Sequence, residues 1–90
     1  METEFHALIV SSRGHLSDSE LRDVQEFVEA RDFALALETL CGFLIDRKKT
    51  VTPELYLRIH MLGERLEGVD PYLLHTLKAI AFEASELEST

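Results

Sequence analysis

The chain is poor in the features that mark secreted and membrane proteins. It holds a single cysteine in 90 residues, so no disulfide can form within it. Cys41 lies inside an apolar run, which is typical of a buried, reduced thiol. No window approaches the roughly 20 apolar residues of a membrane span. The apolar run at 7–10 is too short for a signal peptide. We therefore expect a cytoplasmic protein with no membrane segment.

Basic residues are also scarce. Nine Lys and Arg stand against 17 Asp and Glu, which gives a formal net charge of −8. This charge repels nucleic-acid phosphates and anionic lipid headgroups, whereas it attracts basic proteins and speeds their encounter. We expect neither nucleic acid nor a membrane as a partner. The composition, 46% apolar and 29% charged, is that of an ordinary globular protein, and residues 1–90 make one domain.

Motifs of enzymes and metal sites are missing as well. The sequence has no G-x-S-x-G, no P-loop and no G-x-G-x-x-G. The four histidines are His6, His15, His60 and His75. No two of them have the i, i+3 or i, i+4 spacing that metal ligands on one helix need. We predict no catalytic residue, no metal and no cofactor, and thus a protein that is not an enzyme.

Glycine and proline are few, four and two, and each marks a boundary between segments whose apolar spacing is helical. The pattern predicts an all-α fold, a compact bundle of four to five short helices in which neighbours are roughly antiparallel. The helices are expected at about 2–13, 18–30, 33–47, 53–67 and 71–86, with a frayed tail at 87–90.

Local signals mark where these helices begin and end. Ser17 and Glu20 have the spacing of a capping box. Thr52-Pro53 and Asp70-Pro71 each combine an N-cap with a proline in the first turn. Gly14 and Gly68 are expected to stop the first and fourth helices.

The third predicted helix is apolar around most of its circumference, so we expect it to be central. Small residues at Ala34, Ala36 and Gly42 should let neighbouring helices approach closely. The basic cluster Arg47-Lys48-Lys49 should close the helix, since cations are favourable at the negative end of the helix dipole.

Carboxylates on the second helix form the candidate partner-binding face. At 100° per residue, we expect them opposite the apolar stripe of Leu21, Val24 and Val28. One interpretation is a solvated face that keeps the protein soluble. The other is a docking surface for a basic partner, and the net charge favours it. The candidates, with two second choices on the third helix at the end, are Asp18, Glu20, Asp23, Glu26, Glu29, Glu38 and Asp46.

The run ALALETLC at 34–41, the run VTPELY at 51–56, and Ile59 with Leu62 resemble the MafI-type immunity proteins of bacterial polymorphic-toxin and contact-dependent growth inhibition systems. Such proteins are small, acidic and helical. The resemblance covers about residues 21–66 and implies a cytoplasmic antidote that binds and blocks a cognate toxin domain, often a nuclease. The chain departs from the pattern at Arg47-Lys48-Lys49, where acidic or neutral residues would be expected.

Two functions therefore stay open. The first is a toxin-neutralising immunity protein that lays its carboxylates over the basic cleft of a nuclease. The alternative is a helical adaptor or regulatory subunit that docks through an apolar patch of Tyr56, Leu57 and Met61. The adaptor would bind its partner, or weakly a second copy of itself, with little dependence on salt.

Overall fold

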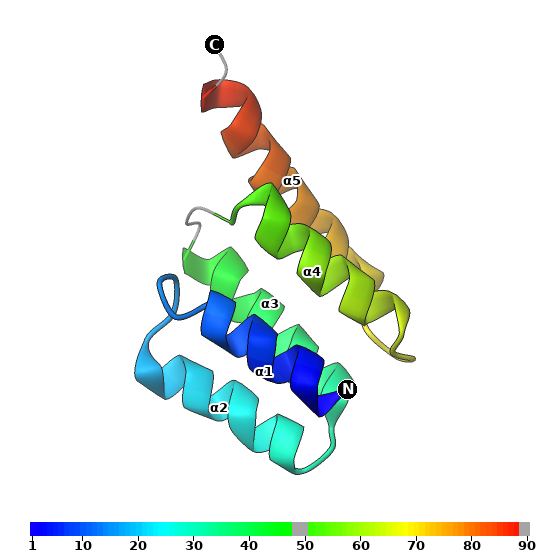
Figure 1. The fold of residues 1–90 in the computed structure, drawn as a ribbon. Helices are drawn as coiled ribbons and strands as arrows, with labels where there is room; N and C mark the ends of the chain where they lie inside the picture. The colour runs from blue at the N-terminus through cyan, green and yellow to red at the C-terminus, as the bar shows by residue number, and fades with distance from the viewer. Residues whose placement is uncertain (48–50, 89–90) are drawn as a thin grey trace.

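The protein is built from α-helices, as Figure 1 shows for this computed structural model. The structure describes the backbone of residues 1–47 and 51–88 and the side chains of residues 1–46 and 51–82. Within these residues there are five helices and no strand, so the predicted all-α bundle is confirmed. The helices are α1 (Glu2–Ser11), α2 (Asp18–Glu29), α3 (Phe33–Arg47), α4 (Pro53–Glu64) and α5 (Pro71–Glu88).

Successive helices run in alternating directions, so neighbours along the chain are roughly antiparallel (Figure 1). Helix α3 packs against α2, α4 and α5, and α4 forms a hairpin with α5. Helix α1 contacts α2 on one side and α4 on the other. The C-terminal end of α5 extends beyond the other helices (Figure 1).

The predicted helix starts are present with their caps. The Glu20 backbone N–H donates to Ser17 Oγ at 3.2 Å, and the Ser17 N–H donates to Glu20 Oε1 at 2.9 Å, which completes the capping box. The Leu55 N–H donates to Thr52 Oγ1 at 3.1 Å. At the start of α5, the Tyr72 N–H donates to Asp70 Oδ1 at 2.9 Å. Local sequence signals thus position α2, α4 and α5.

Helix ends differ from the prediction. Helix α1 ends at Ser11, and α4 ends at Glu64, both short of the glycines expected to stop them. After α1, both His15 and Leu16 donate backbone N–H groups to the Ser12 carbonyl, and this turn brings the Leu16 side chain into the core. After α4, Gly68 sits further along with φ of +88°, which a residue with a side chain rarely adopts. Burial of Leu16 thus accompanies the early end of α1, whereas after α4 the turn at the exposed Gly68 comes four residues beyond the end of the helix.

The end of α2 carries no glycine at all. Arg31 takes up the left-handed conformation with φ of 61°. Its N–H donates to the Val28 carbonyl at 3.0 Å, and the Asp32 N–H donates to the Phe27 carbonyl at 2.9 Å. These two bonds form a Schellman motif, which satisfies carbonyls at the helix end and lets α3 begin at Phe33.

The core is centred on α3, as predicted. Ala36, Leu37, Leu40 and Cys41 are fully buried, and each of the other four helices contributes at least one fully buried side chain, namely Phe5, Val24, Ile59 and Leu77. Neighbouring helices approach closely not at Gly42, as predicted, but at Gly63 on α4. A Cβ on Gly42 would meet nothing within 4 Å, whereas one on Gly63 would lie 3.1 Å from Leu74 Cδ1 and 3.4 Å from Leu37 Cδ2.

The remaining predictions concern the chain ends and the basic cluster. Helix α5 continues to Glu88, beyond the predicted end near residue 86, and residues 89–90 of the predicted frayed tail lie outside the described residues. Lys48 and Lys49 also lie outside them. No described helix is long and apolar enough to cross a membrane.

Candidate functional site

The exposed side of α2 carries the first candidate surface. Asp18, Asp23, Glu26 and Glu29 are all exposed there. Within the described part of the chain, none of these four carboxylates has a hydrogen bond or an ion pair with another side chain. The opposite side of the helix is buried through Leu21, Val24 and Val28. The negative charge of the four carboxylates is therefore directed to solvent. We call Asp18, Asp23, Glu26 and Glu29 the α2 acidic face.

The other predicted site residues are placed differently. Glu20 is half-buried and holds the capping box described above. Glu38, on α3, accepts the Asp70 N–H through Oε2 at 3.1 Å, so it ties α3 to the start of α5. Asp46 is exposed near the C-terminal end of α3. The structure thus does not bring Glu38 together with the α2 acidic face.

One basic residue on α2 escaped the sequence reasoning. Arg22 is exposed and lies four residues from both Asp18 and Glu26, the spacing of neighbours on a helix surface. Four carboxylates and one guanidinium leave this side of α2 with a net charge of −3. The face remains acidic, although less so than its carboxylates alone suggest.

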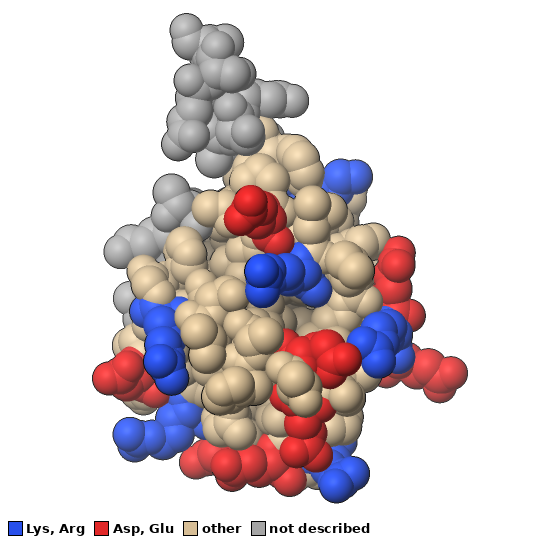
Figure 2. Space-filling model, viewed as in Figure 1, with Lys and Arg blue, Asp and Glu red and all other residues tan. Residues whose placement is uncertain are grey.

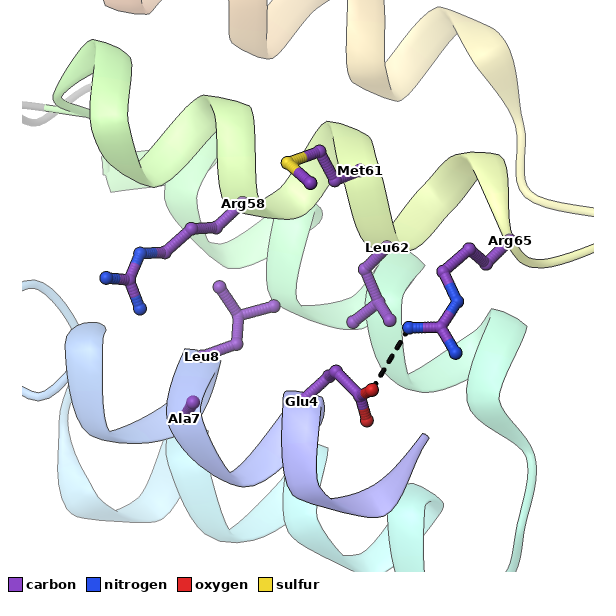
Figure 3. A pocket seen from close by; sticks show the side chains of 7 residues that line it. All are labelled: Glu4, Ala7, Leu8, Arg58, Met61, Leu62 and Arg65. Carbon is purple, nitrogen blue, oxygen red and sulfur yellow. Dashed lines mark hydrogen bonds and ion pairs between the residues drawn. The ribbon is translucent and has the colours of Figure 1, made fainter.

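A second candidate surface lies between α1 and α4, where a pocket of about 240 Å³ opens on the surface (Figure 3). We call it the α1/α4 groove. Leu8 and Leu62 are buried and point toward one another between the two helices, and Met61 is exposed beside them. Figure 2 shows this side of the molecule, where uncharged side chains lie among scattered acidic and basic ones. The lining residues are Glu4, Ala7, Leu8, Arg58, Met61, Leu62 and Arg65.

Two arginines stand at the ends of the groove. Arg65 Nη1 forms an ion pair with Glu4 Oε1 at 3.0 Å (Figure 3). Arg58 Nη1 reaches Ser11 Oγ at 3.5 Å, a long hydrogen bond, and has no carboxylate partner among the described residues. Sequence reasoning missed both arginines, because it could not place α1 against α4. Its only signal here was the exposed apolar residue Met61.

The predicted apolar patch on α4 is present only in part. Leu57 and Met61 are exposed, by 49% and 65%. Tyr56 is only 5% exposed, so its assignment to this patch was wrong. Its ring packs edge-on against Phe82 at 5.9 Å, and its hydroxyl lies 3.4 Å from His60 Nδ1. Tyr56 belongs to the α4/α5 contact.

Glu4 is the most perturbed carboxyl group beside the groove. Hydrogen bonds from the N-terminal ammonium of Met1, at 2.9 Å, and from Arg65 lower the pKa of Glu4 to about 2. Because the folded pKa lies below the ordinary value of 4.5, the ionised carboxylate stabilises the fold above about pH 4.5. This contribution is lost as the pH falls through about 2.

Glu4→Gln should therefore flatten the acid side of the stability profile. The melting temperature of the wild type should fall more steeply between pH 4.5 and 2 than that of the variant, and thermal melts followed by circular dichroism would measure it. Arg65→Gln removes one of the two partners of Glu4. Its melting temperature should fall with pH less steeply than that of the wild type and more steeply than that of Glu4→Gln. Parallel profiles for all three proteins would show that Glu4 is not coupled to folding.

Cys41 is buried, as the sequence predicted. Burial, and then the negative charge of Glu38, raise the pKa of the thiol to about 12. The thiolate is the reactive form, so the thiol is held in its unreactive state. In the part of the chain that the structure describes, no cluster of three or more His, Cys, Asp or Glu side chains could hold a metal ion.

Comparisons with known proteins give no relative for this chain. No family model matches it, no curated protein sequence matches it, and no solved structure matches it. What the chain binds must therefore be inferred from the chemistry of its own surface.

Proposed function

We propose that this protein is a cytoplasmic immunity protein that binds a cognate bacterial toxin domain, a nuclease, and covers its basic cleft. The α2 acidic face is the observation that carries the proposal. Its four carboxylates are exposed and unpaired within the described residues, and the net charge of −8 would speed the encounter with a basic domain. The resemblance of residues 34–41 and 51–56 to MafI-type immunity proteins supports the same function.

The length of the face suits such a cleft. Glu29 lies eleven positions after Asp18, which at 1.5 Å per residue is about 16.5 Å along the helix. One strand of nucleic acid advances about 3.4 Å per phosphate, so the face is about as long as five nucleotides. A helix that presents carboxylates over this length would occupy phosphate-binding side chains of a nuclease and exclude its substrate by steric and electrostatic means.

Neutralising two carboxylates at the centre of the face tests the proposal. Asp23→Asn with Glu26→Gln should weaken binding to the cognate toxin domain by about 10- to 100-fold, with a slower association rate. The matched control is Glu54→Gln with Glu67→Gln, which removes the same charge from two exposed positions outside α2. Stopped-flow and calorimetric titrations at several salt concentrations would measure both.

The control variant should bind the toxin domain only slightly more weakly than the wild type, because its net charge is less negative. Equal losses for the two pairs would remove the α2 acidic face from the proposal. Co-expression offers a second readout, since the wild type should rescue growth of cells that make the toxin domain, and the α2 variant should do so poorly.

A second candidate function is a helical adaptor, favoured by the apolar side chains of Leu57 and Met61, which are exposed on α4. An adaptor that docks through apolar side chains would bind with little dependence on salt, because apolar burial involves no charge pairing. The salt dependence of binding therefore separates the two candidates.

A further inference from the structure

We infer that the α1/α4 groove is a docking site for an acidic amphipathic helix of a partner protein, with two carboxylates about seven residues apart and apolar side chains between them. This surface is separate from the α2 acidic face, and the inference does not rest on the proposed immunity function. It rests on the volume of the groove, on its apolar floor and on the two arginines at its ends.

The groove favours an apolar occupant. A volume of about 240 Å³ would hold about eight waters at their liquid volume of roughly 30 Å³ each. Those waters would meet few polar partners at the floor, where Leu8 and Leu62 lie. Replacing poorly bonded waters with an apolar side chain is favourable. An anchor such as leucine, inserted between α1 and α4, would use this space.

The arginines define the charge of the occupant. Arg58 has no carboxylate partner within the described residues, so its guanidinium is available to an incoming acid. Arg65 donates to Glu4 through one nitrogen, and a guanidinium has five N–H donors, so it can bind a second carboxylate. With the ionised Glu4, the two arginines leave the groove lining with a net charge of +1, in a chain whose net charge is −8.

The spacing of the arginines suits a helix. Arg58 and Arg65 are seven residues apart on α4, about 10.5 Å along its axis. A helix lying along the groove would match them with carboxylates at positions i and i+7, and residues i+3 and i+4 would share the same face and enter the groove.

The test uses a helical 14-residue peptide with glutamates at i and i+7 and leucines at i+3 and i+4, and a partner peptide with lysines in place of the glutamates. Methyl spectra of the full chain should shift at Leu8, Met61 and Leu62 on addition of the glutamate peptide. The lysine peptide should bind at least about 5-fold more weakly, because each exposed charge pair changes affinity by a few-fold. Arg58→Glu should reverse this preference.

Two matched variants test the location. Ala7→Leu should fill the groove and weaken binding of the glutamate peptide at least about 10-fold, the effect of occluding an anchor pocket. Ala79→Leu adds the same side chain at an exposed position on α5 and should leave binding unchanged. Both positions are exposed, and circular dichroism would verify that both variants fold.

Three results would overturn the inference. The first is equal binding of the two peptides, and the second is an equal effect of the two leucine variants. The third is tighter binding of octanoate than of the glutamate peptide, which would make the groove a site for small amphiphiles. Concentration-dependent sedimentation of the chain alone, abolished by Ala7→Leu, would identify a second copy as the occupant and also overturn it.

Discussion

Replacing Phe5 with alanine is expected to lower the free energy of unfolding by about 3–5 kcal/mol, the usual effect of removing a buried aromatic ring. The Phe5 side chain is 0% exposed, and its ring stacks on that of Phe33 with centroids 5.6 Å apart. A domain of this size has roughly 5–15 kcal/mol of stability in total. Phe5→Ala should therefore leave the fold marginal, and urea titration followed by circular dichroism would measure the loss.

The buried thiol of Cys41 reports whether the whole core opens. Cys41 lies on α3, remote in sequence from Phe5, and reacts only when the core exposes it. If Phe5→Ala destabilises the whole fold, thiol labelling should speed up by about 100- to 4,000-fold, the same loss expressed as an equilibrium constant. Labelling at the wild-type rate, with helix content lost, would instead mean that α1 detaches alone.

The control for this prediction is Tyr72→Ala. Tyr72 is also an aromatic residue near the start of a helix, but its side chain is 69% exposed. Surface substitutions usually change stability by no more than about 0.5 kcal/mol. If the two variants were equally stable, Phe5 would not anchor α1 in the core.

Much of the fold could be predicted because its signals are local. The capping box of Ser17 and Glu20 lies within four residues, and Thr52-Pro53 forms a helix start on its own. The apolar circumference of α3 identified it as the central helix from sequence alone. Each of these features depends on local hydrogen bonding or on the periodicity of apolar residues. Both involve residues that are close together in the sequence, so both can be recognised before the fold is known.

The features that escaped prediction depend on distant parts of the chain. Helix α1 stops at Ser11 because the following turn buries Leu16, which only the packed structure reveals. The left-handed Arg31 has no local signal, because glycine is the usual residue at that position. Tyr56 looked like a surface residue beside Leu57, yet its contact with Phe82 on α5 buries it.

Of the two candidate surfaces, one could be predicted from local sequence and the other could not. Periodicity predicted that all five α2 carboxylates would lie opposite the stripe of Leu21, Val24 and Val28. The four of the α2 acidic face are exposed, whereas Glu20 is half-buried in the capping box. The α1/α4 groove could not be predicted from the sequence. The hydrogen bonds across it join Ser11 to Arg58 and Glu4 to Arg65, which are 47 and 61 residues apart in the sequence. No spacing rule connects such residues before the helices are placed.

Replacing Gly63 with valine should lower the free energy of unfolding by about 1–3 kcal/mol, the usual effect of overpacking a well-filled core. Gly63 is buried where α4 meets α3 and α5. A Cβ there would already lie 3.1 Å from Leu74 Cδ1, closer than ordinary van der Waals contact, and the two methyl groups of valine would add to the overlap. Because α4 also forms one wall of the α1/α4 groove, a shift of α4 should also change the methyl signals of Met61 and Leu62.

The matched control is Gly42→Val, which makes the same substitution on α3 where a new Cβ would meet nothing within 4 Å. Valine has a higher helix propensity than glycine, so this variant should be neutral or more stable by up to about 0.5 kcal/mol. The two glycines thus predict opposite signs for one substitution, and thermal melts of both variants would measure the difference. If Gly63→Val were as stable as Gly42→Val, then α4 would not be held in close contact with Leu74 and Leu37 at this position.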